Sequence, residues 1–561
     1  MSRTNTQDLA HSVSGSATPP DKYEVARQWE QVRATIEAVE TPENMGALVD
    51  RAERLYGQHL AWSFFERGEQ LTFSEVAIAS RKAANALRSQ GIARGSRVAM
   101  MVPNSAIYLS TWLGLARLGA ALVPVNGRYT SRELAHVLKT SGAEMLIIDP
   151  EFRPLVDEIA DADLTVPRDG ILLSANGDEE CWERIVDTAS DEFTPSVEVH
   201  GDDILNVQFT SGTTGFPKGC LLPQRYWTNA AVTWGEYTAG VTIDRFLCNQ
   251  MLFYVDGQFN AAFCLYRGAT FYCCAKPSSS RFLGWVRDFR INSVFYFDPL
   301  FKAPPTENDA ANDLNLLHIF GFNPSRHQEL QERYGAPARE SFGMSEFAPS
   351  LLMPLDADVM VGSGSCGLLA PFTEARLVDD QGNDVERGAK GELVVRSPAM
   401  MKGYVNNPEA TAETLKDGWL HTGDLFRQDD AGFFYIVGRK KDMIRRNAEN
   451  VACAEVEAVL RLHPQVLEAA VVAVPDEVMG EEIKAYLQLR PDAVSQRTEP
   501  AMVLAFCSDH LASFKIPRYV AFVDAFPMTE SARVAKKELI KGSPDLRVGA
   551  YDRVAGQWIT S

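Results

Sequence analysis

The sequence lacks several features that would assign it quickly to a class of protein. None of its nine cysteines forms a C-x-x-C spacing, and most stand in apolar contexts, so we expect reduced core residues rather than disulfides or a metal site. No stretch approaches about 20 uninterrupted apolar residues, so no membrane-spanning helix is expected. With 55 Lys and Arg against 74 Asp and Glu, the net charge of −19 argues against a general basic surface for nucleic acid. These absences predict a cytoplasmic protein.

The composition that is present is that of a globular protein of more than one domain. The chain has 561 residues, of which 45% are hydrophobic and 23% charged. Residues 1–22 are mostly small and polar and lack the apolar core of a signal peptide, so we expect a disordered tail. Helical patterns over residues 73–90, 106–118 and 131–141 alternate with strand patterns over 97–102, 120–124 and 144–149. Such alternation predicts parallel sheets covered by helices.

The pattern changes in the last third of the chain. Short β segments are predicted at residues 375–379, 391–396 and 433–437, and after a charged stretch at 439–442 the alternation restarts. Helices are then expected at 454–462 and 499–511, with strands at 466–474, 484–489 and 518–523. We therefore predict a large α/β domain over residues 23–438, built from helix-covered parallel sheets and a smaller β unit. A hinge at 439–442 would join it to a small, mobile α+β domain over 443–561.

One stretch near the middle has the composition of a phosphate-binding loop. Phe209-Thr-Ser-Gly-Thr-Thr-Gly-Phe-Pro-Lys-Gly219 holds three glycines, four hydroxyl side chains and one lysine. Glycines let the backbone approach an anion, hydroxyl and N–H groups donate hydrogen bonds, and Lys218 adds a positive charge. A flexible surface loop is the alternative. The stretch is not a Walker A loop, because Gly219 follows the lysine where that motif needs a hydroxyl.

Further motifs follow in a recognisable order. Ser341-Phe-Gly-Met-Ser-Glu346, Trp419-Leu-His-Thr-Gly-Asp424 and Tyr435-Ile-Val-Gly-Arg439 stand after the glycine-rich loop. Together they resemble the motifs of the adenylate-forming superfamily, which includes acyl-CoA synthetases, peptide-synthetase adenylation domains and firefly luciferase. The resemblance extends from about Leu71 to Leu539 and is closest to acyl-CoA synthetases. It implies that a carboxylic acid reacts with ATP to give acyl-AMP and pyrophosphate, with Mg²⁺ present, and that the acyl group then passes to CoA.

The resemblance also implies roles for individual residues. Thr210, Ser211, Thr213, Thr214 and Lys218 would bind the ATP phosphates, and Ser341, Phe342, Gly343 and Ser345 would contact the nucleotide. Asp424 would bind the ribose, Arg439 would be a further ribose or phosphate contact, and Lys441 would be the hinge. Glu346 would hold Mg²⁺, a cation that prefers oxygen ligands. Structural alternatives remain for three of these sites: a solvated carboxylate at Glu346, a turn residue at Asp424, and linker charges at 439–442.

Three positions depart from the family pattern. Arg533 stands where the family has a catalytic lysine. This leaves three alternatives: Arg533 performs the role of the lysine, Lys536 or Lys537 performs it, or adenylation is slow. Asn447 and Ala448 replace two glycines of the loop that lines the pantetheine tunnel. The preceding pair, Arg445 and Arg446, either binds a CoA phosphate or is an exposed basic pair. Tyr254 stands where the family often has histidine, and it either lines the acyl pocket or is a core aromatic.

The predicted acyl pocket combines aromatic and polar residues. Its members are Tyr254, Asp256, Gln258, Phe322, Asn323 and Phe347, together with neighbouring residues of Ser341 to Gly343. This mixture favours a small carboxylic acid with an apolar or aromatic body and a polar group.

An acyl-CoA synthetase is the leading hypothesis for the function. A second hypothesis is an acyl-adenylate former that delivers to an amine or a carrier protein, and a third is a nucleotide-binding protein without catalysis. The sequence leaves open a homodimer and does not identify the acid.

Overall fold

The structure is a computed structural model that describes residues 20–174, 181–210, 217–296, 300, 304–446, 449–476, 479–491, 498–511, 513–529 and 533–560. Contacts within the chain divide it into two compact units. The first comprises residues 1–375, 395–420 and 431–433, and the second comprises 376–394, 421–430 and 434–561. Most of the predicted tail lies outside the described residues. The boundary after residue 438 and the hinge at 439–442 stay predictions.

The first unit contains a six-stranded sheet in the order β6-β5-β3-β4-β7-β8. Its strands are β3 (Arg97–Met101), β4 (Ala121–Pro124), β5 (Met145–Ile148), β6 (Ile171–Leu173), β7 (Ile204–Thr210) and β8 (Lys218–Pro223). All neighbours are parallel except β7 and β8, which form an antiparallel hairpin. Helices α3 (Phe73–Ser89), α4 (Ala106–Leu118), α5 (Ser131–Ser141), α6 (Arg153–Asp157) and α7 (Trp182–Thr188) connect or follow its strands.

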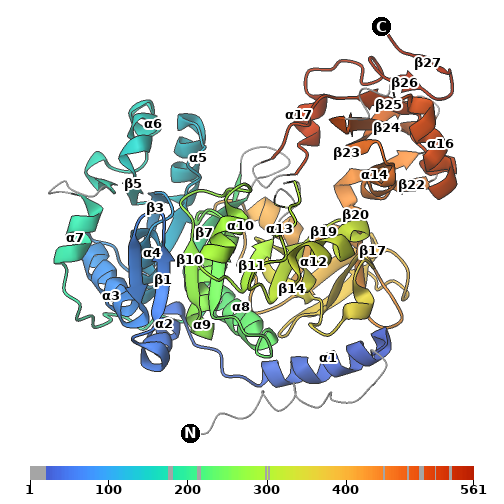
Figure 1. The fold of residues 1–561 in the computed structure, drawn as a ribbon. Coiled ribbons are helices and arrows are strands. Elements are labelled where there is room, and N and C mark those ends of the chain that lie inside the picture. Colours follow the sequence, from blue (N-terminus) through green and yellow to red (C-terminus); the bar gives the residue numbers. More distant parts are fainter. Residues whose placement is uncertain are drawn as a thin grey trace. The chain divides into compact units, whose positions relative to one another are not determined.

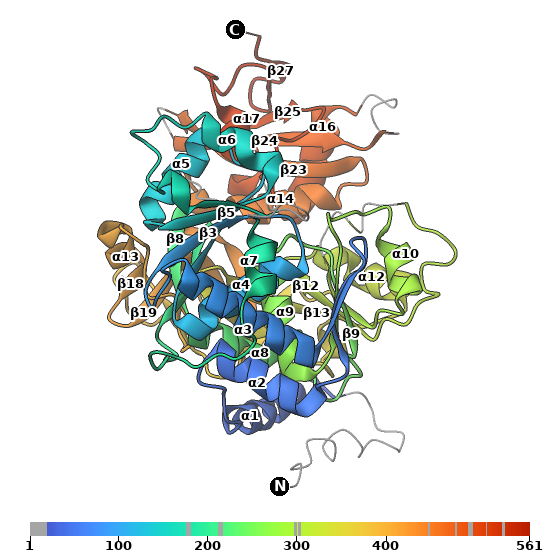
Figure 2. The ribbon, with the colours of Figure 1, turned by 90° about the vertical axis from the view of Figure 1, so that its left-hand side faces the viewer.

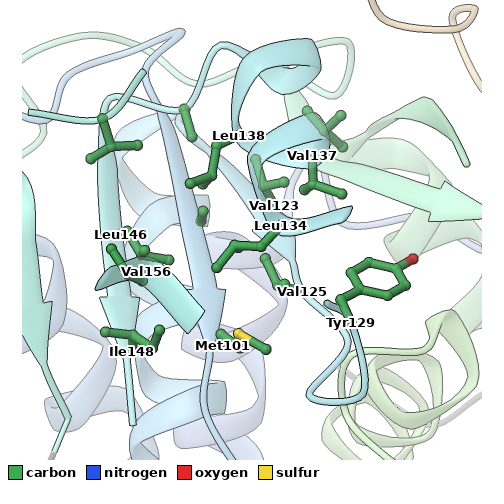
Figure 3. Packing of buried hydrophobic residues seen from close by; sticks show 14 of the residues in the cluster. Met101, Val123, Val125, Tyr129, Leu134, Val137, Leu138, Leu146, Ile148 and Val156 are labelled. Carbon is green, nitrogen blue, oxygen red and sulfur yellow. The ribbon is translucent and has the colours of Figure 1, made fainter. Parts of the chain in front are cut away.

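Helix α5 illustrates how local signals and packing agree. Thr130 and Glu133 form a reciprocal capping box at its start, and Gly142, with φ of 65°, ends it in the left-handed region. In Figure 3, Leu134, Val137 and Leu138 of α5 meet Val123 and Leu146 of the strands in one buried cluster. Burying each such side chain contributes about 2 kcal/mol, so the helix is held on this face of the sheet.

A second sheet of the first unit runs in the order β15-β14-β13-β12-β11-β9-β10-β1-β2. Its strands are β1 (Leu60–Phe64), β2 (Glu69–Thr72), β9 (Arg245–Cys248), β10 (Thr270–Cys273), β11 (Ser293–Tyr296), β12 (Leu316–Phe320), β13 (Ala338–Met344), β14 (Phe347–Leu352) and β15 (Ser365–Leu369). Helix α8 (Gln224–Tyr237) packs against β8 of one sheet and β14 of the other, and α9 (Val255–Arg267) packs on β9 and β10 (Figure 2). The first unit further contains α1 (Lys22–Glu37), α2 (Met45–Tyr56), α10 (Phe282–Asp288), α12 (His327–Tyr334), α13 (Pro408–Thr414) and β18 (Leu415–Lys416).

The second unit has its own core and contains one sheet that is separate from those of the first unit. Strands β16 (Glu374–Val378), β17 (Gly391–Arg396), β19 (Trp419–Gln428) and β20 (Phe434–Arg439) are consecutive neighbours that lie largely in this unit. A separate sheet contains β21 (Met443–Arg446), β22 (Glu449–Ala452), β23 (Val466–Asp476), β24 (Gly480–Leu489), β25 (Tyr519–Phe522), β26 (Tyr551–Asp552) and β27 (Gln557–Trp558). Helices α14 (Cys453–Leu462) and α16 (Pro500–His510) bury apolar side chains with these strands, and the short α17 (Lys536–Ile540) follows (Figure 1).

These two units confirm the predicted fold class of a large α/β domain and a small α+β domain. The helix predicted at 106–118 is α4 with the same bounds, and the strand predicted at 391–396 is β17. All nine cysteines are buried and free, as predicted. Within the described part of the chain, none of the helices combines the length and the apolar character needed to cross a bilayer.

Candidate active site

The glycine-rich loop is carried by the β7–β8 hairpin. Thr210 at the end of β7 is the register partner of Lys218 at the start of β8, and the Thr210 hydroxyl lies 3.5 Å from the Lys218 carbonyl oxygen. Antiparallel pairing therefore holds the two ends of the loop together. Ser211, Thr213 and Thr214 lie outside the described residues.

Lys218 belongs to a cluster with Tyr404 and Glu346. The Lys218 ammonium lies 5.1 Å from the centroid of the Tyr404 ring, at cation–π distance. The Tyr404 hydroxyl donates a hydrogen bond of 2.9 Å to Oε1 of Glu346, whose side chain is almost fully buried. Burial, together with the nearby Glu346 carboxylate, raises the pKa of Tyr404, so its hydroxyl stays protonated and acts as a donor. The cluster thus joins the loop lysine to the carboxylate predicted to bind Mg²⁺.

The β13–β14 hairpin positions Glu346. Met344 and Phe347 are register partners, so Ser345 and Glu346 occupy the turn between them, and the backbone N–H of Met401 donates to the Glu346 carbonyl at 2.7 Å. Close approach of the two strands favours glycine at 343, because an added Cβ would lie 3.0 Å from the Cα of Pro349. Strand β13 therefore carries Ser341, Phe342 and Gly343 next to the turn that holds Glu346.

Aromatic side chains adjoin this hairpin, but they differ in exposure. The rings of Phe342 and Phe347 are 6.0 Å apart. Phe322 is buried in the cluster that also contains Tyr296, whereas Phe320, at the end of β12, is 42% exposed. The side-chain oxygen of Asn323 accepts hydrogen bonds from the backbone N–H and the hydroxyl of Ser325. Asn323 thereby caps the short 3₁₀ turn over Pro324–Arg326.

The first turn of α9 carries the other predicted pocket residues. Tyr254 is half-buried at the N-cap and Asp256 is exposed, so both lie at the surface of the unit. Gln258 is fully buried, and its amide accepts from Asn206 at 2.7 Å and donates to the Leu252 carbonyl at 2.8 Å. These bonds give Gln258 a structural role in this conformation, whereas Tyr254 and Asp256 are accessible to a ligand.

The second unit contains the residues predicted to bind ribose. Asp424 and Arg439 are register partners on β19 and β20, and Nε of Arg439 lies 3.0 Å from Oδ1 of the buried Asp424. Gly423 has φ of 70°, a left-handed conformation that favours glycine, and its N–H donates to Glu392 at 3.0 Å. Glu392 also lies 3.2 Å from Lys440. Although burial opposes the shift, the hydrogen bonds from His421 and Lys440 lower the pKa of Glu392.

The residues predicted for CoA binding and for the hinge are only partly described. Arg446 makes two hydrogen bonds, of 2.8 and 2.9 Å, to the buried carboxylate of Glu482, which gives its guanidinium a structural partner. Lys441 lies in a 3₁₀ turn over Lys440–Asp442. The side chains of Lys441 and Arg445, and residues 447 and 448, lie outside the described part of the chain.

Arg533 and Lys536, two of the three residues that could replace the missing catalytic lysine, have different surroundings. The Arg533 side chain is exposed, and the Thr529 N–H donates a hydrogen bond to the Arg533 carbonyl at 2.7 Å. The Lys536 ammonium lies 2.7 Å from Glu457 and 3.9 Å from Asp442. Although burial opposes the shift, Glu457 raises the pKa of Lys536. Lys536 is therefore held by carboxylates of its own unit.

Sequence analysis missed Tyr404, Glu392 and Lys440. Tyr404 stands in the turn-rich stretch 400–407, 58 positions from its partner Glu346, and no local pattern marks it. Lys440 is part of the charged stretch that the sequence suggested only as linker or hinge. Among the described residues no group of three or more His, Cys, Asp or Glu side chains could hold a metal ion.

Known proteins resemble this chain over most of its length. The family described as AMP-binding enzyme matches residues 49–405, and the AMP-binding enzyme C-terminal domain matches residues 455–533. A feruloyl-CoA synthase of Amycolatopsis sp is 35% identical over 485 residues, which cover 84% of this chain and 94% of the relative. A long-chain fatty acid–CoA ligase of Mycobacterium tuberculosis is 31% identical over 480 residues, covering 84% and 92%. The solved amide bond synthetase of Marinactinospora thermotolerans is similar with a TM-score of 0.76 and 26% identity, covering 88% and 99%. The chain therefore belongs to the family of AMP-binding enzymes.

Proposed function

We propose that this AMP-forming carboxylic acid–CoA ligase acts on an acid with an aromatic body. The enzyme activates a carboxylic acid as acyl-AMP with release of pyrophosphate, and then transfers the acyl group to CoA with release of AMP. In the first step a carboxylate oxygen bonds to the α-phosphorus of ATP and the bond to the pyrophosphate oxygen breaks. In the second step the CoA thiol loses its proton and its sulfur displaces AMP from the acyl carbon.

The cluster of Lys218, Tyr404 and Glu346 carries the proposal. Lys218 would offset negative charge on the ATP phosphates, with Thr210, Ser211, Thr213 and Thr214 as hydrogen-bond donors. Glu346 fits a hard cation, because its buried carboxylate accepts from a neutral hydroxyl and no described lysine or arginine pairs with it. When bound there, Mg²⁺ would neutralise phosphate charge, and the phosphates themselves would complete its oxygen ligands.

The second unit would supply the remaining contacts. We assign Asp424 to the ribose, Arg439 to the ribose or a phosphate, Arg533 to the reacting carboxylate and α-phosphate, and Arg445 to a CoA phosphate, while Arg446 stays paired with Glu482. Lys441 would be the hinge between the two half-reactions. Nine free cysteines suit a reducing compartment such as the cytoplasm, and a homodimer is a compatible assembly.

Two observations favour an aromatic acid. The rings of Phe342 and Phe347 lie 6.0 Å apart beside the Glu346 turn, Phe320 is exposed at the end of β12, and flat rings suit recognition of a ring. A relative that covers most of this chain is named for the feruloyl group, which is an aromatic acyl group. An amine is the alternative acceptor, because a structure of similar fold is an amide bond synthetase.

Mass spectrometry of the purified enzyme tests the proposal. It would be incubated with ATP, Mg²⁺ and cinnamate, benzoate, hexanoate or palmitate, each with and without CoA. We expect an aryl-CoA that forms only with CoA and is lost in Lys218→Ala, because the phosphate charge is then uncompensated. Strong preference for hexanoate or palmitate would refute the aromatic substrate. Acyl-AMP that CoA does not consume but an added amine does would establish the alternative acceptor.

A further inference from the structure

Three buried side-chain amides hold the loop that connects β9 to α9, residues 249–254. They belong to Asn104, Gln208 and Gln258, which are 1%, 3% and 0% exposed. Each donates a hydrogen bond of 2.8 Å to a different backbone carbonyl of the loop: Asn104 to Gln250, Gln208 to Phe253 and Gln258 to Leu252. A buried amide destabilises the fold unless it is hydrogen-bonded, so three of them on one short loop call for an explanation.

The loop is also fixed against the helix that follows it. The Leu252 N–H donates to Oδ1 of Asn104 at 2.8 Å. A Cβ added at Gly257 would lie 2.8 Å from the Met251 carbonyl oxygen, so the first turn of α9 packs directly on the loop. Loop and helix therefore form one packed piece, and Tyr254 lies half-buried at their junction.

Gln208 links this piece to the strand that leads into the glycine-rich loop. Side chains alternate between the two faces of a strand, so Gln208 shares one face of β7 with Thr210. Val207 and Phe209 take the opposite face, where they are buried in the apolar cluster that includes α5. On its own face Gln208 reaches the Phe253 carbonyl. One side chain therefore connects the base of the predicted phosphate loop to the loop that precedes the predicted acyl-pocket residues of α9.

We propose that Gln208 is a positioning residue that aligns the acid substrate with ATP. Its hydrogen bond holds the carbonyl immediately before Tyr254, and through that backbone it fixes the wall of the acyl pocket relative to the phosphate loop. Because the carboxylate must approach the α-phosphorus in line with the departing pyrophosphate, a small displacement of this wall impairs the reaction. The inference rests on the proposed ligase function, with Tyr254 in the acyl pocket, and adds the residue that aligns the two substrates.

Replacement of Gln208 by an apolar residue of similar length tests the alignment. Gln208→Met keeps the bulk of the side chain and removes the amide donor. ATP–pyrophosphate exchange would be measured on the full-length enzyme with whichever of cinnamate, benzoate, hexanoate and palmitate the wild type activates fastest. We expect KM for that acid to rise about tenfold, the scale of one lost hydrogen bond, while KM for ATP stays within about twofold of the wild type.

Gln224 of α8 provides a matched control. It is also fully buried, accepts the Met45 N–H at 3.0 Å and donates to the Ala116 carbonyl at 3.0 Å, so its partners lie outside residues 249–254. Gln224→Met should lower the melting temperature much as Gln208→Met does, yet leave KM for the acid and for ATP within about twofold of the wild type. Gln208→Leu gives a second apolar replacement if Gln208→Met does not fold.

The outcomes separate alignment from folding and from the choice of acid. Unchanged KM values in Gln208→Met, or equal rises for the acid and for ATP, would refute the positioning role. An equal rise for the acid in Gln224→Met would refute it too, because loosening the core elsewhere would then suffice. If neither variant of Gln208 folds while Gln224→Met does, Gln208 is structural, which also overturns the proposal. If the wild type prefers hexanoate or palmitate, the proposed aromatic acid fails, but the comparison of KM values still decides the role of Gln208.

Discussion

At the scale of single residues, Tyr404 is the side chain that connects the glycine-rich loop to the carboxylate of the next motif. Its ring faces Lys218 and its hydroxyl bonds to Glu346. We predict that Tyr404→Phe keeps the ring but frees the carboxylate, and that kcat/KM for ATP falls about tenfold, as expected for a lost hydrogen bond to a charged group. ATP–pyrophosphate exchange measures this. Tyr404→Leu, which also removes the ring, should lose more, and equal activity of both variants and the wild type would contradict the connection.

Arg533 and Lys536 make a second comparison between single residues. Removing the exposed Arg533 guanidinium by Arg533→Ala should lower acyl-AMP formation about 100-fold, the scale of one lost charge contact in a transition state, and leave the melting temperature unchanged. Arg533→Lys should restore most of the rate. Lys536→Ala should instead lower the melting temperature, because the buried Glu457 loses its partner at 2.7 Å. A larger loss of rate in Lys536→Ala than in Arg533→Ala would assign the catalytic role to Lys536.

At the scale of secondary-structure elements, strand β13 holds the turn that follows β12. The carboxylate of Glu340 accepts the backbone N–H of Gly321 at 2.5 Å and that of Phe322 at 3.3 Å. Burial raises the pKa of Glu340 from 4.5 to about 8, although those N–H groups oppose the shift. Between these two values the folded protein binds more protons than the unfolded chain. The free energy of unfolding therefore falls as pH rises through this window, by up to about 1.4 kcal/mol per pH unit.

We predict that Glu340→Gln removes this pH dependence, since the amide is neutral throughout and keeps an oxygen for the turn. Urea unfolding from pH 5 to pH 8 should show the stability of the variant rising relative to the wild type as pH increases. The exposed Glu307→Gln serves as the control and should leave the difference from wild type constant. A constant difference for Glu340→Gln as well would show that Glu340 is ionised throughout the folded state.

Helices and strands were predictable from the sequence where neighbouring residues determine them. Helix α4 is a run of apolar residues that ends at Gly119, whose φ of 68° is left-handed, so both its existence and its end follow from neighbouring residues. Contacts between distant segments were not predictable. Tyr404 meets Lys218 and Glu346, and Arg446 meets Glu482, only because strands far apart in sequence become neighbours. The sequence motifs therefore identified the residues at the two ends of the site, whereas the residues that connect them could be identified only from the folded structure.

At the scale of the whole molecule, each of the two units has a core of its own. The first unit buries clusters around its two sheets, and the second buries separate clusters that include Val471 and Tyr486. Residues predicted for the phosphates lie in the first unit, and Asp424, Arg439 and Arg533 lie in the second. The proposed chemistry consequently requires residues of both units, and the predicted hinge residue Lys441 lies in the second.

A substitution at Lys441 tests whether the chain there is a hinge. Proline fixes φ near −65°, a value compatible with the 3₁₀ turn over Lys440–Asp442, and so restricts any rotation of the backbone at this residue. We predict that Lys441→Pro keeps one half-reaction within about threefold of the wild type and slows the other by at least about tenfold, because one conformation is retained. ATP–pyrophosphate exchange measures acyl-AMP formation, and single-turnover conversion of supplied acyl-AMP measures thioester formation. Lys441→Ala, which removes the charge but leaves the backbone free, should change neither. If the two half-reactions fall equally in Lys441→Pro, or if Lys441→Ala reproduces its effect, residue 441 contributes through stability or charge and the rotation lies elsewhere in the chain.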